Sequence, residues 1–292
     1  MIHASSTPAP VATQDARFPR ISVVTPSLNQ AAFIEATIRS VLDQGYPALD
    51  YIVIDGGSTD GTQAILQHYS SRLRWVSEPD RGQADAINKG LRMAEGDILA
   101  YLNSDDLYLP RTLAQVAGYL AAHPEAGWVY GDCRLIDEGG ETIGRLRAPD
   151  FDLNRMILRG EYIPQPAAFW RRSAGAVAGE FNVALRYSMD YDYFIRLGQH
   201  APGHRLEAEL ACFRLQPVSK TISSEEKHWR ETLMVSEWYG LKPWTAWYWL
   251  RRIRHRGLRA LPGSWQRRIR RRLGRGQDDY QARHDSRSLS GE

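Results

Sequence analysis

An apolar segment that ends in two adjacent acids is the strongest chemical signal in this chain. Residues 97–106 read DILAYLNSDD, so 97–103 is predicted as a buried strand followed by Asp105 and Asp106. Ligands of open α/β sheets bind outside the carboxyl ends of strands. Mg²⁺ and Mn²⁺ prefer oxygen ligands and usually take one or two from protein, with phosphates and water supplying the rest. We therefore expect these acids to present a divalent metal to a nucleotide diphosphate; the alternative is a turn before the next helix.

The elements before this segment alternate between strand and helix patterns. Short β-branched or apolar runs at 21–25, 51–55 and 73–77 predict strands, and apolar residues at helical spacing predict helices after the first and second runs and at 83–93. Strands that alternate with helices favour a parallel sheet with right-handed crossovers. We therefore predict an α/β, Rossmann-like, mostly parallel sheet flanked by helices.

Composition sets the broad class of the protein. The chain has 292 residues, 43% hydrophobic and 24% charged, which is typical of a globular protein of one or two domains. The two cysteines, Cys133 and Cys212, are too few for a disulfide framework and favour a reducing compartment. No apolar run approaches the length of a membrane span, and 1–20 reads as a flexible leader without a signal-peptide core. We expect a cytoplasmic protein.

Charge is distributed unevenly along the chain. The segment 242–275 contains twelve Lys or Arg and no acid, whereas the whole chain has a net charge of only +3, so the body is acidic. Tryptophans interleave with these cations, a composition suited to helices that lie on an anionic lipid surface. We expect 223–275 to be a basic amphipathic helical extension on the inner face of the membrane, or a basic helix packed on the body, and 276–292 to be disordered.

Four motifs in register then point to a family. They are TPSLN at 25–29, VIDGGSTDGT at 53–62, DRGQ at 80–83 with AINKG at 86–90, and LNSDD at 102–106. Together they resemble family-two glycosyltransferases of the GT-A fold, and the resemblance extends over about 21–220. It implies an inverting transferase that uses a nucleotide-diphosphate sugar and Mn²⁺ or Mg²⁺. The predicted catalytic domain is 21–222, with a nucleotide-sugar half at 21–106 and an acceptor half at 107–222.

The resemblance also assigns roles to single residues. Pro26 and Ser27 would line the nucleotide pocket, Asp55 would mark the base or ribose end, and Arg81 would lie near the base or phosphates. Ser104 and Asp105 would contact the donor, with Asp105 and Asp106 at the metal. Gly56 stands where many members have a second acid, and Asn103 replaces the more usual first Asp of the metal motif. From the residues alone, Asp55 could equally be a turn acid that caps the next helix.

The candidate base lies in the acceptor half. Ser188 is predicted as the N-cap of a helix with Asp190 in its first turn, where the helix dipole favours the ionised carboxylate. Such a carboxylate can accept the proton of an attacking hydroxyl, and the family places its catalytic base at the acid that matches Asp190. Met189 stands where relatives often have Glu. Asp192 faces elsewhere and is predicted to be structural; the alternative is that both acids only begin a helix.

These observations predict an inverting, metal-dependent hexosyltransferase-type enzyme. Its acceptor would be a saccharide or lipid-linked hydroxyl in cell-surface polysaccharide or glycan synthesis. The alternatives are a nucleotidyltransferase, whose usual Lys and Arg signature is absent after Thr25, and a nucleotide-sugar or nucleic-acid binding protein without transferase activity. A nucleic-acid partner is not expected, because it would leave the acidic body without a role. The histidines at 68, 123, 200 and 204 show no ligand spacing and are interpreted as surface or packing residues.

Overall fold

A computed structural model describes residues 18–216, 225–246 and 248–250 of the chain. Residues 1–17 of the predicted leader, the end of the resemblance at 217–220, residues 251–275 of the basic segment and the tail predicted as disordered at 276–292 therefore lie outside the described residues. The strands and helices of the first half, in chain order, are β1 Ile21–Ser27, α1 Ile34–Leu42, β2 Leu49–Asp55, α2 Thr62–His68, β3 Arg74–Ser77, α3 Gln83–Met93, β4 Ile98–Tyr101, β5 Leu107–Tyr108 and α4 Thr112–Ala122.

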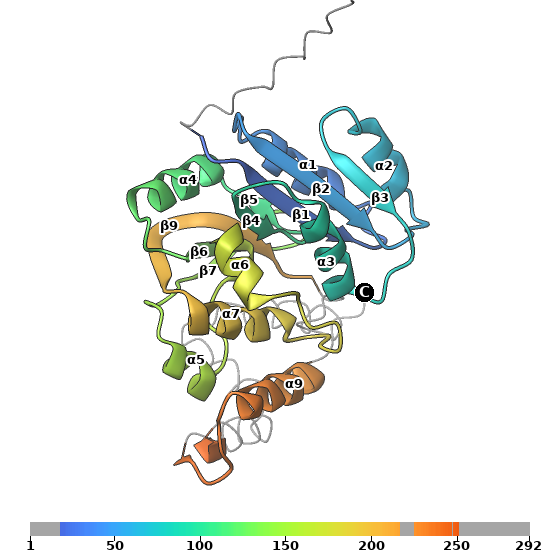
Figure 1. Cartoon of the computed structure of the whole chain (residues 1–292). Helices are drawn as coiled ribbons and strands as arrows, with labels where there is room; N and C mark the ends of the chain where they lie inside the picture. Colours follow the sequence, from blue (N-terminus) through green and yellow to red (C-terminus); the bar gives the residue numbers. More distant parts are fainter. Residues whose placement is uncertain (1–17, 217–224, 247, 251–292) are drawn as a thin grey trace, which may run out of the picture.

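The second half combines two long strands, β6 and β9, with shorter strands and helices (Figure 1). Its elements are β6 Trp128–Ile136, β7 Thr142–Leu146, α5 Leu153–Arg159, the 3-10 helix η1 Gln165–Ala167, β8 Ala168–Arg171, α6 Arg172–Ala178, α7 Met189–His200, β9 Gly203–Arg214 and α9 Glu225–Trp238. A short turn at 137–140 joins β6 to the antiparallel strand β7.

All the described strands belong to one sheet. Its order is β3-β2-β1-β4-β8-β6-β9-β5, with β7 paired to β6. The β3-β2-β1-β4 half is parallel, as the alternating sequence pattern predicts. From β8 onward the sheet is mixed: β8 pairs antiparallel with β4 and β6, whereas β6 and β9 run parallel. The acceptor half therefore continues the same sheet.

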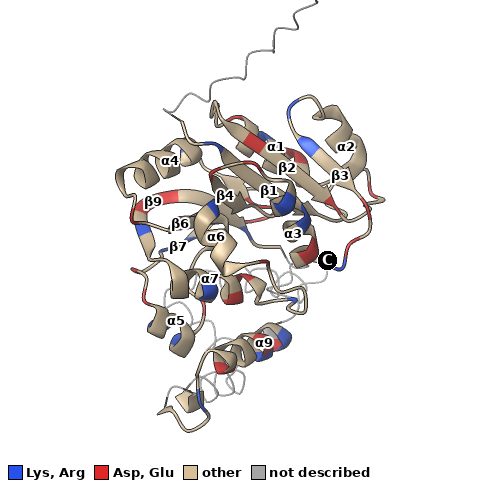
Figure 2. Cartoon of the chain, viewed as in Figure 1, with Lys and Arg blue, Asp and Glu red and all other residues tan. Residues whose placement is uncertain are grey.

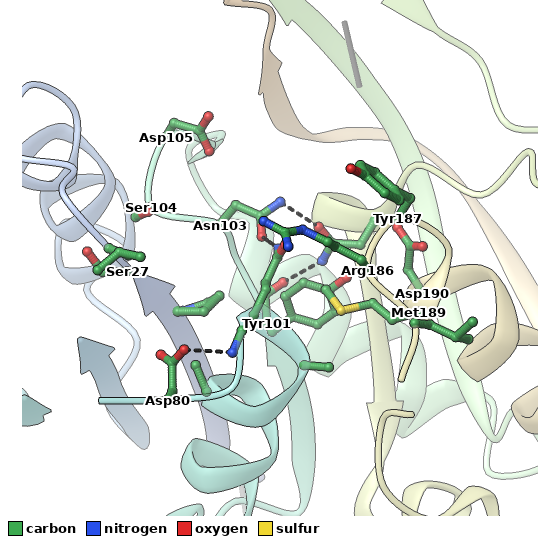
Figure 3. A pocket seen from close by; sticks show the side chains of 18 of the residues that line it. Ser27, Asp80, Tyr101, Asn103, Ser104, Asp105, Arg186, Tyr187, Met189 and Asp190 are labelled. Atoms are coloured by element: carbon green, nitrogen blue, oxygen red, sulfur yellow. Dashed lines mark hydrogen bonds between the residues drawn. The ribbon is translucent and has the colours of Figure 1, made fainter. Parts of the chain in front are cut away.

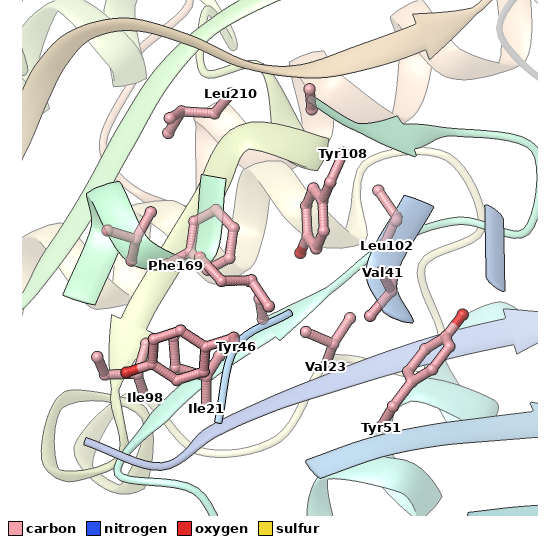
Figure 4. Close-up of a cluster of buried hydrophobic side chains, with 14 of the residues drawn as sticks. Ile21, Val23, Val41, Tyr46, Tyr51, Ile98, Leu102, Tyr108, Phe169 and Leu210 are labelled. Atoms are coloured by element: carbon pink, nitrogen blue, oxygen red, sulfur yellow. The ribbon is translucent and has the colours of Figure 1, made fainter. Parts of the chain in front are cut away.

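Helices cover both faces of the sheet because successive strand residues point to opposite sides. Val23 of β1 packs with α1, α2 and α4 in one core, part of which is drawn in Figure 4. Its neighbour Val24 packs on the other face in a second core with α3, α6 and α7. Trp170, buried between β4 and β6, belongs to this second core, as predicted. The two cores hold the strand ends at one edge, where the polar loops gather.

The described part of the C-terminal extension packs on α7 and α5. Val235 of α9 is buried in the second core, and Leu233 lies in a smaller cluster with Leu241 and Tyr248. α9 contains acidic as well as basic residues (Figure 2). The described helix of the extension is therefore a packed helix of mixed charge, and the strongly basic run begins after it. No helix among the described residues is both long and apolar enough to cross a membrane.

Candidate active site

A pocket of about 790 Å³ lies at the carboxyl edge of the sheet. Its wall is built by the ends of β1 and β9, the loops after β3 and β4, η1, and the segment that leads into α7. Figure 3 shows Ser27 and Asp80 on one side of the pocket and Tyr187, Met189 and Asp190 on the other. The volume falls within the range of about 300–1,000 Å³ that is usual for small-molecule sites. Of the residues predicted for the site, Pro26, Ser27, Arg81, Ser104, Asp105 and Asp190 line it.

The two adjacent acids after β4 have different environments. Asp105 lines the pocket, and its Oδ2 accepts a hydrogen bond of 2.5 Å from the Gln216 amide. Asp106 is only 1% exposed and is absent from the pocket wall. Its carboxylate accepts hydrogen bonds from the backbone N–H of Arg214 at 2.9 Å and from the Asn103 amide at 3.1 Å. The two acids predicted to bind the metal therefore differ. Asp105 faces the pocket, whereas the buried carboxylate of Asp106 is bonded to Arg214 and Asn103 and holds the loop in place.

Electrostatics reinforce this division. Burial raises the pKa of Asp106 well above its ordinary value, and the nearby charge of Asp105 raises it further. Two carboxylates that face the same small volume do not both ionise easily. The hydrogen bonds to Asp106 partly offset this effect because they favour its charged form.

Arg214 at the end of β9 holds the acidic loop in place. Its Nε donates to the carbonyl oxygen of Asp105 at 2.8 Å, and its Nη1 donates to the carbonyls of Asp137 and Glu138 at 2.8 and 2.9 Å. The guanidinium also lies over the Phe33 ring at 5.1 Å. Arg214 also lines the pocket. The structure assigns its guanidinium to three backbone carbonyls.

The end of β1 supplies an apolar and a polar contact to the pocket. Pro26 and Ser27 both line it. Ser27 Oγ is buried and has no hydrogen-bond partner within the described part of the chain. Because buried hydroxyls are normally paired, an orphaned hydroxyl in a pocket wall is suited to a polar ligand.

Asp55 ends β2 but does not line the pocket. Its fully buried carboxylate accepts hydrogen bonds from the backbone N–H of Ser58 at 2.9 Å and from the Ser77 hydroxyl at 2.6 Å, and it also accepts from the Ser58 hydroxyl. It therefore fixes the glycine-containing loop to β3. In this structure, the turn alternative describes the carboxylate of Asp55 better than a direct ribose contact does.

Arg81 lies at the rim of the pocket, on the loop between β3 and α3. Its Nη2 donates to Asp85 at 3.0 Å, one helical turn further along, and most of its side chain faces solvent. This placement leaves an exposed, positively charged group at the mouth of the pocket, where an anion would enter.

The candidate base, Asp190, lies at the N-terminal end of α7. Asp190 is in the first turn of the helix, as predicted, and lines the pocket. Ser188 occupies the N-cap position, but its hydroxyl contacts Thr232 at 2.8 Å and makes no capping hydrogen bond. The cap prediction was therefore right about position and wrong about contact. Asp192 faces away, where it pairs with Arg196 and accepts from the Tyr239 hydroxyl, which supports the structural role predicted for it.

Glu161, on the loop between α5 and η1, is a second carboxyl close to Asp190. Its Oε1 is buried and lacks a hydrogen-bond partner among the described residues. Burial raises the pKa of Glu161 well above its ordinary value, and the charge of Asp190 raises it further. The same two carboxyl groups act on Tyr101. Burial raises the pKa of its hydroxyl, and the charges of Asp190 and Glu161 raise it further. Burial and the neighbouring charge of Asp190 therefore both favour the protonated form of Glu161.

Hydrogen-bonded side chains from separate elements form another part of the pocket wall. Gln165 of η1 donates to the Tyr101 carbonyl at 2.8 Å and accepts from Asn103 at 3.2 Å, while Gln83 donates to Asn103 at 2.7 Å. These bonds form a polar floor (Figure 3). Arg186, which immediately precedes Tyr187, points its guanidinium over this floor, and His228 of α9 also lines the pocket. Arg186 and His228 were not predicted for the site, because no local sequence motif marks them.

The sheet order, the helices on both faces and the acidic loop at the carboxyl edge define a glycosyltransferase of the GT-A fold. The chain belongs to glycosyl transferase family 2, whose model matches residues 22–175. Among curated proteins, a PGL/p-HBAD biosynthesis glycosyltransferase of Mycobacterium bovis is 33% identical over 183 residues, which cover 61% of this chain and 69% of the relative. An uncharacterized glycosyltransferase of Mycobacterium tuberculosis is 32% identical over 184 residues, covering 61% and 68% of the two chains.

Two solved structures share the fold at low sequence identity. S. aureus TarS 1-349 in complex with UDP-GlcNAc matches with a TM-score of 0.61 and 19% identity, covering 74% of this chain and 65% of that one. A mannosyltransferase from Pyrobaculum calidifontis in complex with GDP-Man and Mn²⁺ matches with a TM-score of 0.54 and 23% identity, covering 73% and 62%. This chain thus spans a little under two thirds of each.

Proposed function

We propose that this glycosyltransferase inverts the anomeric centre of a sugar that it moves from a nucleotide-diphosphate sugar to an acceptor hydroxyl. The observation that carries the proposal is that Asp105 and Asp190, which are separated by 85 positions in sequence, line one pocket. One carboxylate is placed at the loop that would meet the donor, and the other lies across the pocket, where an acceptor can approach (Figure 3). An inverting displacement requires the nucleophile and the leaving group on opposite sides of the anomeric carbon.

The donor side has the chemistry of a nucleotide-binding site. The orphaned hydroxyl of Ser27, the exposed cation of Arg81 and the guanidinium of Arg186 all face the pocket. Arginines recognise phosphates well because their planar guanidinium can form paired hydrogen bonds. The related folds that hold UDP-GlcNAc and GDP-Man support a nucleotide-sugar donor for this chain as well.

A divalent metal fits the donor side. Asp105 provides a carboxylate at the pocket wall, and a single carboxylate completed by substrate phosphates and water is a common way to hold Mg²⁺ or Mn²⁺. When bound, such an ion neutralises the charge that grows on a departing diphosphate. Asp105 would hold the ion, and Gln216 would orient the Asp105 carboxylate. We assign Asp106 a positioning role, because its carboxylate is already bonded to Arg214 and Asn103.

Asp190 would act as the general base. Its carboxylate takes the proton of the acceptor hydroxyl while the hydroxyl oxygen attacks the anomeric carbon and the bond from that carbon to the phosphate oxygen breaks. The nucleoside diphosphate leaves with the bonding electrons. Because the hydroxyl attacks from the opposite side, the configuration of the anomeric carbon is inverted. The raised pKa of Glu161 favours its protonated form, which limits the negative charge beside Asp190.

The acceptor and the location are proposed from the C-terminal extension. Trp238, Trp249 and Leu250 are more than half exposed, and Trp244 is 80% exposed, immediately before the basic run. Exposed tryptophans next to cations are suited to the headgroup region of an anionic membrane. We infer a cytoplasmic enzyme on the inner membrane face that serves a saccharide or lipid-linked acceptor in cell-surface polysaccharide or glycan synthesis. Flotation with anionic vesicles tests this, and equal flotation of Trp244→Ser would contradict it.

A ligand screen tests the donor site. Melting temperature is measured with UDP, GDP or dTDP, each with and without Mn²⁺, because a ligand that binds only the folded protein stabilises it. We expect one nucleotide to raise the melting temperature in a Mn²⁺-dependent manner, and Asp105→Asn to remove the Mn²⁺ dependence. Asp43→Asn, at an exposed position after α1, is the matched control. A wild-type protein that responds to none of the nucleotides would contradict the proposed donor site.

A further inference from the structure

Two histidines and a glutamate from separate elements meet at the opposite end of β9 from the catalytic pocket. His123 and Glu125 lie on the connection from α4 to β6, and His204 is the second residue of β9. One ligand atom from each lies within 4.8 Å of the others, the only such group of three His, Cys or carboxylate residues within the described chain. His204 is paired in register with Val129 of β6, so the sheet sets its distance from the connection.

The connection itself is held rigidly. Arg171 of β8 donates to the carbonyl oxygens of Leu120, His123 and Ala126 at 2.6, 3.1 and 2.8 Å. The backbone N–H of Ala126 also donates to the His123 carbonyl at 3.1 Å, which closes a tight turn. His123 and Glu125 are therefore presented from a braced turn, which lowers the entropy lost when a ligand fixes them.

The donor atoms are close to a coordination geometry. His123 Nδ1 lies 3.2 Å and His204 Nδ1 lies 4.0 Å from Glu125 Oε1. Tetrahedral zinc with bonds of about 2.0–2.1 Å places its ligand atoms roughly 3.3 Å apart. The first distance already matches, and the second requires a shift of under about 1 Å by Glu125, whose side chain is 58% exposed.

Tyr119 lies beside both histidines of the cluster. The Tyr119 ring packs against His123 with ring centroids 4.3 Å apart, and the Tyr119 hydroxyl lies 3.3 Å from His204 Nδ1. Two neutral imidazoles and one carboxylate are a ligand set typical of zinc.

We propose that His123, Glu125 and His204 form a binding site for Zn²⁺ that is distinct from the catalytic pocket. The ion would tie the C-terminal end of α4 to the start of β9, with water in the fourth position.

The test uses the full chain without an added histidine tag, stripped with a chelator. Zn²⁺ is titrated in competition with a chromogenic chelator, and Co²⁺ is added separately to record the visible spectrum of a tetrahedral site. We expect one Zn²⁺ equivalent that is weakened at least about 100-fold by His204→Gln, because loss of a direct ligand should exceed the usual 10–100-fold cost of losing an outer-shell contact. His200→Gln, which alters an exposed histidine outside the cluster, should leave it unchanged.

Two further variants make the outcome unambiguous. Glu125→Gln changes an exposed side chain and should also lose the ion, which protects the test if His204→Gln folds poorly. Asp105→Asn should retain the ion, because it alters only the catalytic pocket. Retention of tight Zn²⁺ binding in both His204→Gln and Glu125→Gln would overturn the proposal. Loss of the equivalent in Asp105→Asn would overturn it too, because the ion would then belong to the catalytic pocket.

Discussion

Replacing Arg214 with Met should destabilise the protein and loosen the acidic loop together. The substitution keeps an apolar stem but removes the donors to the carbonyls of Asp105, Asp137 and Glu138. Hydrogen bonds from a charged group contribute about 1.5–3 kcal/mol each. The turn carbonyls at 137 and 138 can regain water, because Glu138 is exposed. We therefore expect a loss of about 2–4 kcal/mol in the free energy of unfolding.

This change is measurable by urea denaturation followed by circular dichroism and by scanning calorimetry. At about 2 °C per kcal/mol for a chain of this size, the melting temperature should fall by roughly 4–8 °C. Arg214→Lys should recover only part of the loss, because an ammonium group cannot reproduce the fork of a guanidinium.

The matched control is Arg145→Met on β7. Arg145 is largely exposed and pairs with Glu209 at 3.0 Å, so its loss should cost less than about 1 kcal/mol. The reasoning is refuted if Arg214→Met lies within about 0.5 kcal/mol of the wild type, a difference typical of ordinary surface substitutions. It is equally refuted if Arg145→Met proves as destabilising as Arg214→Met.

Two other predictions concern a buried acid and a buried glycine. The pKa of Glu161 is raised in the folded state from an ordinary 4.5, so its contribution to stability is complete below about pH 4.5 and is lost as the pH rises. In urea unfolding, the stability of Glu161→Gln relative to wild type should therefore increase toward alkaline pH. Equal stability of the two proteins at every pH would contradict the assignment. Gly90 of α3 packs so tightly on β1 that an added Cβ would lie 3.0 Å or less from both methyl carbons of Val24. Overpacking should destabilise Gly90→Ala by about 1–3 kcal/mol, whereas the higher helix propensity of Ala should stabilise it by up to about 1 kcal/mol. We therefore expect a net loss of about 1–2 kcal/mol in the free energy of unfolding. A variant more stable than wild type would contradict this prediction.

Local patterns predicted the first half of the fold well. The helix at 83–93 has the predicted bounds, and the strands at 21–27, 49–55, 74–77 and 98–101 overlap the predicted runs. Each of these elements has its signal within its own residues, as apolar periodicity bounded by Gly, Pro or polar turns. The mixed half of the sheet was not predicted, because the pairing of β8 between β4 and β6 depends on contacts between distant segments.

The same distinction separates the predicted and the missed parts of the site. Motifs indicated Asp105 and Asp190, and both line the pocket. The different environments of Asp105 and Asp106 depend on Arg214 and Gln216, more than 100 positions away. Glu161 likewise gained its buried, unpaired state only from the packing around it.

The histidines of the proposed zinc site could not be recognised from their spacing in the sequence. His123 and His204 are 81 positions apart and show no ligand spacing in the sequence, yet the register between β6 and β9 places them around Glu125. Sequence patterns report neighbours along one element, whereas a ligand set assembled by strand pairing becomes visible only in three dimensions.

The central claim is that Asp190 removes the proton from the attacking hydroxyl while other residues hold the donor. The most direct measurement compares turnover and donor affinity of Asp190→Asn with those of wild type. Donor hydrolysis, with water as acceptor, gives the turnover, and calorimetric titration gives the dissociation constant. We predict a fall in turnover of about 10²–10⁴-fold with donor affinity within about threefold of wild type, because only proton transfer is lost. Wild-type turnover, or an equal loss of binding and turnover, would contradict the account.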